Sequence, residues 1–199
     1  MNTHELLINL CKDKDVLDLG FVQHSTKHHE KKDWLHKNLK NVSKSIHGLD
    51  FLEKEINYFK SKGYDCSYGN VENFSLNKKF EVIVAGELIE HLSNFDGFLT
   101  CCRKHLSNDG IMVVTTPNAF AFGNILTIFK RIFGKFPNIN KEHTCWFDEI
   151  TLGLLFKRFN FKIIEINTYP SPSKKNINKF LSKILKFYPS SKIVGIFSL

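Results

Sequence analysis

Residues 81–92 read EVIVAGELIEHL, and residues 110–118 read GIMVVTTPN. The first stretch is a short apolar run that ends in Ala85-Gly86 and continues into an acidic turn. An amphipathic segment follows, and the second stretch is another apolar run, which Pro117 stops. This pattern predicts a strand–helix–strand unit with a right-handed crossover. Its loops then lie at the carboxyl ends of the strands, where open α/β sheets bind ligands.

The same alternation of apolar strands and amphipathic helices continues along the chain. We expect strands at residues 15–20, 45–50, 64–69, 80–86, 111–116, 161–169 and 192–198. We expect helices at residues 29–41, 52–62, 92–106, 119–133, 148–159 and 176–187. A turn at Asn108-Asp109-Gly110 should separate the third of these helices from the next strand. The ladder predicts an α/β fold with a mostly parallel sheet covered on both faces.

Length and composition favour one globular domain. The chain has 199 residues, of which 42% are hydrophobic, and no linker-like segment divides it. No apolar run reaches the roughly 20 residues that span a bilayer. The first residues lack the basic-then-apolar layout of a signal peptide. We therefore expect a soluble, cytoplasmic protein.

The formal net charge of +8 does not by itself indicate a nucleic-acid partner. Only three of the 28 basic residues are Arg, and the Lys residues are scattered over the whole length. Nucleic-acid-binding proteins more often cluster basic residues on one face. The five Cys residues contain no C-x-x-C pair, so reduced thiols are expected. His24, His28 and His29 have no acidic or Cys ligands at suitable spacing, and no metal site is predicted.

The turn after the first strand reads GFVQH at residues 20–24. A dinucleotide pyrophosphate needs two or three glycines there, and Gly20 stands alone. NAD or FAD is therefore not expected, whereas a nucleoside without a pyrophosphate remains compatible with the turn. Asp50, at the end of the second strand, is placed to accept hydrogen bonds from a ribose 2′,3′-diol. The alternative role for Asp50 is to cap the helix that follows it.

Polar residues also follow the third and fourth strands. Asn70-Val71-Glu72 offers a side-chain amide and a backbone N–H that suit an adenine edge, although a plain polar turn has the same composition. Glu87, Glu90 and His91 come just after the fourth strand. His91 is either a general base or part of a helix start. His143 lies in a loop expected to pass over the same strand ends, where it would touch substrate.

Over residues 15–169, the sequence resembles class I S-adenosylmethionine-dependent methyltransferases. VLDLG at residues 16–20 matches the first motif of that family, and GLD at 48–50 matches its ribose-binding acid. The matches continue with the adenine turn at 70–72, the fourth strand and acidic loop at 80–92, and the fifth strand at 110–118. WLH at 34–36 and EHTCWFD at 142–148 are similar to small-molecule methyltransferases found among surface-glycan and natural-product genes. The family usually continues its first motif as Gly-x-Gly, whereas here Phe21 and Val22 stand where they would crowd the methionine tail of the cofactor.

The resemblance implies a Rossmann-like, doubly wound, seven-stranded sheet, mostly parallel, into which residues 192–198 insert as an antiparallel last strand. It also implies a cofactor half at about 13–118, a substrate-side loop and helices at about 119–160, and a C-terminal helix and strand at 174–199. The expected reaction transfers a methyl group to a small-molecule or glycan hydroxyl, with His91 and His143 as candidate bases and Phe120, Phe122, Trp146 and Phe147 as a dry lid. The cofactor would be S-adenosyl-L-methionine, held by Asp18, Gly20, Asp50, Phe51, Asn70, Val71, Glu72, Gly86 and Glu87.

Two alternatives stay open. The altered turn after Gly20 is compatible with an inactive methyltransferase-fold protein that serves as a binding or scaffold module. Residues 174–187 interleave Lys with apolar residues, as an interfacial helix does, which would place the enzyme at a membrane surface with a lipid-linked substrate. A helix packed on the sheet with a solvated Lys face explains the same pattern.

Overall fold

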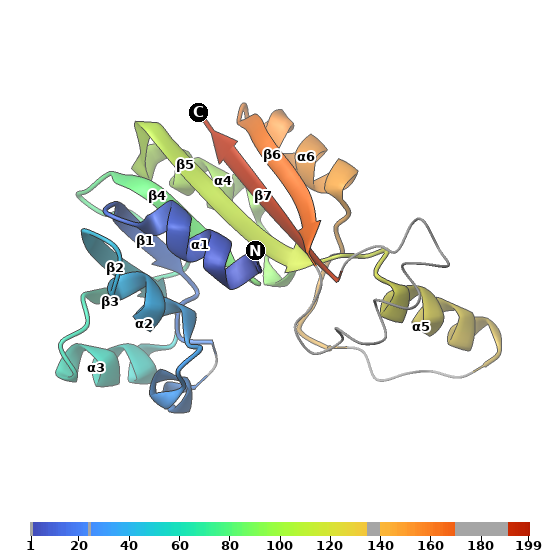
Figure 1. Ribbon diagram of the computed structural model, residues 1–199, viewed down its shortest axis with the longest axis horizontal. Coiled ribbons are helices and arrows are strands. Elements are labelled where there is room, and N and C mark those ends of the chain that lie inside the picture. Colours follow the sequence, from blue (N-terminus) through green and yellow to red (C-terminus); the bar gives the residue numbers. More distant parts are fainter. Residues whose placement is uncertain (1, 24, 135–139, 170–190) are drawn as a thin grey trace.

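A seven-stranded sheet forms the centre of the molecule (Figure 1). The computed structural model describes residues 2–23, 25–134, 140–169 and 191–199. The strand order is β3-β2-β1-β4-β5-β7-β6, parallel from β3 to β5, with β7 antiparallel to both of its neighbours. The predicted fold class and the antiparallel last strand are therefore confirmed. The strands are β1 (Asp15–Leu19), β2 (Ser45–Asp50), β3 (Cys66–Tyr68), β4 (Phe80–Gly86), β5 (Leu106–Pro117), β6 (Lys162–Tyr169) and β7 (Lys192–Ser198).

Helices cover both faces of the sheet because successive strand residues point to opposite sides. On one face, Val16, Val82 and Val84 pack with α1 and with Leu39 of α2. On the other face, the neighbouring residues of the same strands pack with α4 and α6, and Figure 1 shows these two helices behind the sheet. The helices are α1 (Thr3–Cys11), α2 (Leu35–Lys40), α3 (Glu53–Ser61), α4 (Phe95–His105), α5 (Phe122–Ile132) and α6 (Glu149–Arg158), with short 3-10 turns η1 (Thr26–Glu30) and η2 (Ile89–His91).

The connection from β1 to α2 forms its own apolar cluster with α3. Phe21, Val22 and Trp34 are buried there together with Ile56 and Phe59 of α3. The Trp34 indole stacks on Phe59 at 5.2 Å between ring centroids, and its Nε1 donates to the Phe21 carbonyl at 3.0 Å. This packing explains why the helix predicted at 29–41 is wrong in its first half. Trp34 has extended backbone and ends the irregular segment, so α2 begins only at Leu35.

Two other predicted boundaries need correction. The helix expected at 92–106 begins at Phe95, because the Asn94 side chain caps it by accepting from Gly97 N. The turn expected at 108–110 is part of β5, which already pairs with β4 at Leu106 and Phe80. The register then jumps to Ile111 opposite Val82, so the extra residues are absorbed in a bulge instead of a separate turn. Helix α1 had not been predicted.

The helix predicted at 119–133 is present as α5, which extends away from the sheet in Figure 1. The basic amphipathic helix predicted at 176–187 lies outside the described residues. In the part of the chain that the structure describes, none of the helices is long and apolar enough to cross a bilayer.

Candidate active site

The predicted cofactor residues lie at the carboxyl ends of β1 to β4, as their positions in the strand ladder required. Asp18 of β1 is buried, and its Oδ2 lies 2.8 Å from Nδ1 of the buried His36. A carboxylate accepts, so His36 Nδ1 donates and the other ring nitrogen faces away from the pair. That Nε2 atom is buried without a hydrogen-bond partner. Sequence reasoning did not assign a role to His36, and its contact with Asp18 depends on how α2 packs on the sheet.

Asp50, the predicted ribose acid, is only 3% exposed. Its Oδ2 accepts from Val22 N at 3.1 Å, and its Oδ1 accepts from Leu52 N at 3.2 Å. Burial raises the pKa of Asp50 and outweighs these hydrogen bonds, which lower it. The second hydrogen bond is the capping role considered above. The first was not anticipated, and it ties the ribose acid to the turn after Gly20.

That turn is folded inward. The Phe21 ring lies so close to the Gly48 backbone that a Cβ on Gly48 would come within 2.7 Å of it. Gly20 has φ +73°, a left-handed conformation that favours glycine, and its N–H donates to Leu49 O at 2.9 Å. Phe21 and Val22 are therefore part of the apolar cluster under α3, where both are almost fully buried.

The turn after β3 divides the predicted adenine residues between surface and core. Asn70 is exposed, and its Oδ1 accepts from Glu72 N at 2.9 Å. Val71 is buried in the main core. The Glu72 carboxylate accepts from Ser93 N and Asn94 N, and the hydrogen bond from Asn94 is the largest cause that lowers the pKa of Glu72. The side chains of Val71 and Glu72 are thus occupied within the protein.

Phe51, directly after the ribose acid, is 65% exposed, which is unusual for a ring of this size. At the end of β4, Gly86 is half-buried and Glu87 has φ +52°. Glu87 Oε1 accepts from the Thr115 hydroxyl at 3.0 Å, and Glu87 Oε2 lies 3.4 Å from Lys192 Nζ. These residues line the part of the sheet edge that is open to solvent.

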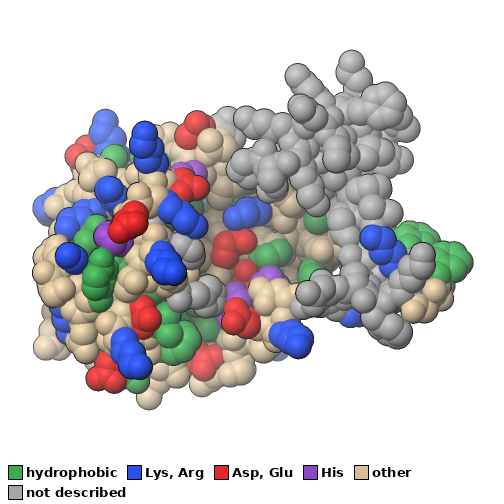
Figure 2. Space-filling view, turned by 90° about the horizontal axis from the view of Figure 1, so that it is seen from below, with side chains coloured by type: hydrophobic (Ala, Val, Ile, Leu, Met, Phe, Trp, Pro, Cys, Tyr) green, Lys and Arg blue, Asp and Glu red, His purple; other side chains and the backbone are tan. Residues whose placement is uncertain are grey.

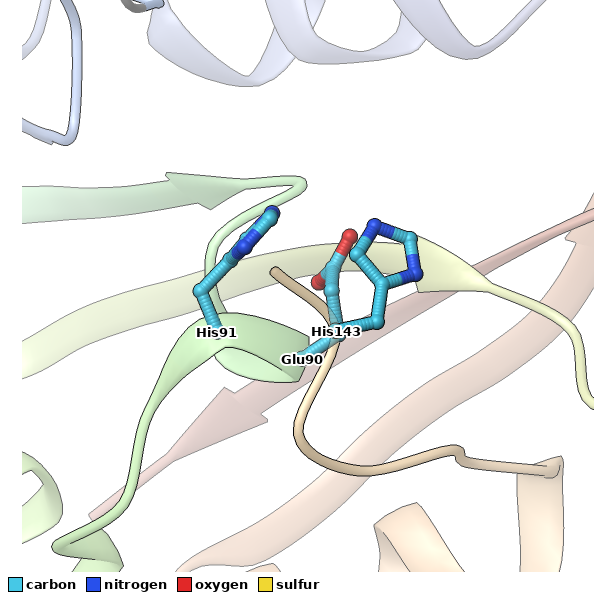
Figure 3. A group of neighbouring side chains, drawn as sticks. All are labelled: Glu90, His91 and His143. Atoms are coloured by element: carbon cyan, nitrogen blue, oxygen red, sulfur yellow. The ribbon is translucent and has the colours of Figure 1, made fainter. Parts of the chain in front are cut away.

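The candidate bases His91 and His143 come together, and Glu90 lies between them (Figure 3). The His rings are 4.8 Å apart between centroids and nearly perpendicular. One ligand-type atom from each of the three side chains lies within 4.8 Å of the other two. Glu90 had been interpreted as a helix start. Its position one residue before His91, in the acidic turn that follows a buried strand, was the available signal for a functional role.

Glu90 is 2% exposed, and its two carboxylate oxygens differ. Oε2 accepts from the Thr116 hydroxyl at 3.1 Å, whereas Oε1 is buried with no hydrogen-bond partner. Burial, together with the charge of Glu87, raises the pKa of Glu90 to about 7. Burial and the neighbouring His91 lower the pKa of His143. Near neutral pH, His143 is therefore mostly an uncharged imidazole with a lone pair to offer.

The loop that carries His143 is tied to η2 by the backbone of Glu90. Thr144 N donates to Glu90 O at 2.9 Å, and the Thr144 hydroxyl donates to Leu92 O at 2.9 Å. From the other side, His91 Nδ1 lies 3.2 Å from Glu142 O. Because a carbonyl only accepts, this contact requires a hydrogen on Nδ1. In the neutral ring, Nε2 then carries the lone pair.

Aromatic residues of the predicted lid differ in exposure. Trp146 is 45% exposed with its ring 6.0 Å from His143, Phe120 is exposed, and Phe147 is buried. Figure 2, which looks at the molecule from below, shows acidic and His side chains gathered near the middle of this face.

The donor set is suited to a nucleoside. Asp18 and Asp50 lie at the ends of adjacent strands, and the exposed ring of Phe51 stands next to Asp50. Each carboxylate has about four acceptor positions, of which Asp50 uses two. A ribose cannot reach Asp50 in this conformation, because the turn that contains Val22, whose N–H donates to Asp50, covers the carboxylate.

Comparisons with known proteins identify the family of the chain. Residues 3–166 match a family model described as a methyltransferase domain. The chain is similar to the ubiquinone biosynthesis O-methyltransferase of Rickettsia canadensis, with 28% identity over 90 residues that cover 42% of this chain and 38% of that protein. It is also similar to a probable S-adenosylmethionine-dependent methyltransferase of Mycolicibacterium smegmatis, with 23% identity over 163 residues, 80% of this chain and 56% of that protein. The chain thus spans roughly half the length of the curated relatives it matches.

Solved structures share the fold at low sequence identity. An S-adenosylmethionine-dependent methyltransferase from Clostridium acetobutylicum superposes with a TM-score of 0.62 at 15% identity, covering 98% of this chain and 87% of that one. The N-methyltransferase NodS from Bradyrhizobium japonicum, in complex with S-adenosyl-L-homocysteine, gives 0.58 at 13% identity, covering 98% and 84%.

Proposed function

The chain belongs to the methyltransferase-domain family of class I S-adenosylmethionine-dependent methyltransferases, and on that premise we propose that it methylates a hydroxyl group of a small molecule or glycan. The observation that carries the choice of a hydroxyl is the Glu90, His91 and His143 cluster at the end of β4. A hydroxyl must lose its proton when its oxygen is methylated, so it needs a basic site. An amine can react through its lone pair first and lose the proton later.

S-adenosylmethionine supplies a methyl group on a positively charged sulfur. In this proposal Asp18 and Asp50 hold the amino-acid and ribose ends of the cofactor, and Phe51 stacks on the adenine. Gly20 and Gly86 provide close backbone approach, and Asn70 and Glu87 provide polar contacts at the rim. Because Asp50 is covered, the turn at residues 20–23 has to move outward before a ribose can reach it.

On the acceptor side, the cluster takes up the proton of the hydroxyl. His143 is the better-placed base, because its lowered pKa keeps the ring uncharged and able to accept a proton near neutral pH. The anchored loop also holds the ring in place. In this proposal Trp146, whose ring centroid lies 6.0 Å from that of His143, covers one side of the cluster when substrate is bound. A drier site favours methyl transfer, because positive charge on sulfur is lost along the reaction.

Calorimetric titration with S-adenosylmethionine and S-adenosylhomocysteine tests the cofactor site. We expect micromolar binding by the wild type and at least a tenfold loss in Asp50→Ala. Asp65→Ala is the matched control, because Asp65 is an exposed carboxylate at the opposite end of the strands. Circular dichroism should show that both variants fold. Absence of binding to either ligand would overturn the proposal.

A second function has its own support. Asp18 and Asp50 already have partners within the protein, which is compatible with a methyltransferase-fold binding or scaffold module without activity. The same titration separates the two candidates. The membrane-surface alternative depends on residues 174–187, which the structure does not describe, and cytoplasmic location stays a prediction.

A further inference from the structure

We propose that Glu90, His91 and His143 bind one divalent transition-metal ion through a carboxylate oxygen and two imidazole nitrogens. The sequence analysis predicted no metal site, because it considered only His24, His28 and His29, whereas the fold brings His143 next to Glu90 and His91. Two imidazoles and one carboxylate are a ligand set typical of Zn²⁺, Fe²⁺ and related ions.

The first observation is the unpartnered oxygen. Glu90 Oε1 is buried and has no hydrogen-bond partner, although the Glu90 side chain lies beside the two His rings. A buried carboxylate oxygen without a donor is costly, unless a cation occupies the place that a donor would take. The charge of Lys192 acts on Glu90 from a distance and lowers its pKa, but Lys192 Nζ is in contact with Glu87 Oε2 at 3.4 Å and does not bond to Glu90 Oε1.

The second observation is the set of contacts behind the ligands. Metal-binding His residues usually donate their other ring N–H to a carbonyl or carboxylate, which fixes the ring. His91 Nδ1 makes a contact of this kind with Glu142 O at 3.2 Å, so Nε2 is the ring atom that would have to face the ion. Thr116 holds the second oxygen of Glu90 in the same way. His143 precedes Thr144, whose backbone and hydroxyl are both anchored.

The geometry requires only a small contraction. The three ligand atoms lie within 4.8 Å of one another, whereas ligands of a tetrahedral Zn²⁺ with bonds of about 2.0–2.1 Å lie roughly 3.4 Å apart. Rotation of the half-buried His rings can close that gap without moving the buried strand ends. Three protein ligands leave a further position open, as in catalytic rather than structural zinc sites.

The role of the ion rests on the proposed function, although its binding does not. An acceptor hydroxyl at the open position would ionise more easily, because the cation stabilises the oxygen anion. The hydroxyl proton passes to water, and an oxygen electron pair forms the O–C bond as the C–S bond breaks and the sulfur becomes neutral. In the metal-loaded protein, the two His residues are therefore ligands, and the cation takes over the task of a base.

The test uses metal-free, tag-free protein and titrates Zn²⁺ by calorimetry and Co²⁺ by visible absorption. We expect one ion per chain in the wild type and at least a ~10-fold weaker dissociation constant in Glu90→Gln and in His143→Ala. His4→Ala, on helix α1, is the control His and should bind like the wild type. Cys145→Ser should also bind like the wild type, which excludes the nearby thiol as the main ligand.

The proposal is overturned if the wild type takes up neither ion, or if both ligand variants bind as well as the wild type. Should Glu90→Gln fail to fold, His143→Ala decides alone, because its side chain is only half-buried in a loop. S-adenosylhomocysteine binding is measured on the same samples. Metal uptake without cofactor binding would preserve this site and remove the proposed function, and cofactor binding without metal uptake would do the reverse.

Discussion

Two groups of buried carboxylates lie along the same edge of the sheet, and they are treated differently by the rest of the protein. At the ends of β1 and β2, Asp18 is paired with His36, and Asp50 accepts from two backbone N–H groups. At the end of β4, one oxygen of Glu90 has no partner. The end of the edge at β1 and β2, called here the closed end, therefore has its carboxylates satisfied by the protein's own groups. The end at β4, called here the open end, keeps one carboxylate oxygen without a donor, and the proposed metal site depends on that oxygen.

The largest expected loss of stability comes from removing Trp34, which packs in the apolar cluster at the closed end. Trp34→Ala should lower the free energy of unfolding by ~3–5 kcal/mol, because Trp34 is 1% exposed and packs on Phe59 and Phe21. The other Trp gives a matched control. Trp146→Ala removes a side chain that is 45% exposed and should cost less than ~1 kcal/mol. Urea denaturation measures both variants, and equal losses would show that the cluster under α3 does not hold the turn.

The next largest expected effect is a gain of stability when a metal ion binds at the open end. A metal that binds only the folded protein should raise its free energy of unfolding by ~2.7 kcal/mol at one hundred times the dissociation constant. Thermal melting with and without Zn²⁺ measures this gain. The gain should disappear in His143→Ala, and a gain of equal size in that variant would place the ion elsewhere.

A pair of isosteric amides compares the two ends directly. Asp50→Asn must place an NH₂ group against the N–H of Val22 or Leu52, so it should lower the free energy of unfolding by ~2 kcal/mol. Glu90→Gln can keep the hydrogen bond from the Thr116 hydroxyl on its remaining oxygen, and the oxygen that it replaces had no hydrogen-bond partner. In metal-free protein, we expect a change within ~1 kcal/mol for this variant. The comparison fails if Glu90→Gln is the more damaging of the two.

The smallest effect concerns Glu72, which holds Ser93 and Asn94 by their N–H groups. Since the pKa of Glu72 is lowered in the folded protein, its contribution to stability is present above the ordinary value of 4.5 and is lost as pH falls through the lowered value. Glu72→Gln should therefore flatten the acid limb of the stability curve by ~1 kcal/mol or less, because the side chain is partly exposed. Unfolding at a series of pH values from 3 to 7, a range of about four units, measures this difference. Identical slopes in variant and wild type would assign the acid limb to other carboxylates.

The fold was readable from the sequence where local pattern decides it. Strands β2, β4 and β7 have the predicted bounds, because each is a buried apolar run flanked by polar or turn residues. The β1–α2 connection was misjudged, because Trp34 is drawn into a cluster with α3 that no local pattern announces. Propensity favoured a longer helix there, and tertiary packing overrode it.

The candidate site was readable only in part for the same reason. Asp18 and Asp50 lie at the carboxyl ends of strands and His91 follows one, so all three could be placed by topology. The pairing of Asp18 with His36 and the contact of His143 with His91 join segments far apart in the chain. Nothing in the spacing of Glu90 indicated that one of its oxygens would be buried without a donor. Which carboxylate is satisfied and which is not depends on side-chain geometry that exists only in the folded state.

The position of β7 has a consequence for how the protein is made. Strand β6 does not touch β5, because β7 lies between them and pairs with both. During synthesis the ribosome releases β6 first, and that strand has no place on the sheet until residues 192–198 emerge. Until then, β5 is an edge strand whose backbone N–H and C=O groups, including those of Val113 and Val114, lack the partners that β7 provides. The nascent chain therefore passes through a stage in which β5 and β6 each have an unpaired edge, because β7 has not yet been made. A chaperone that shields exposed strands would act at that stage.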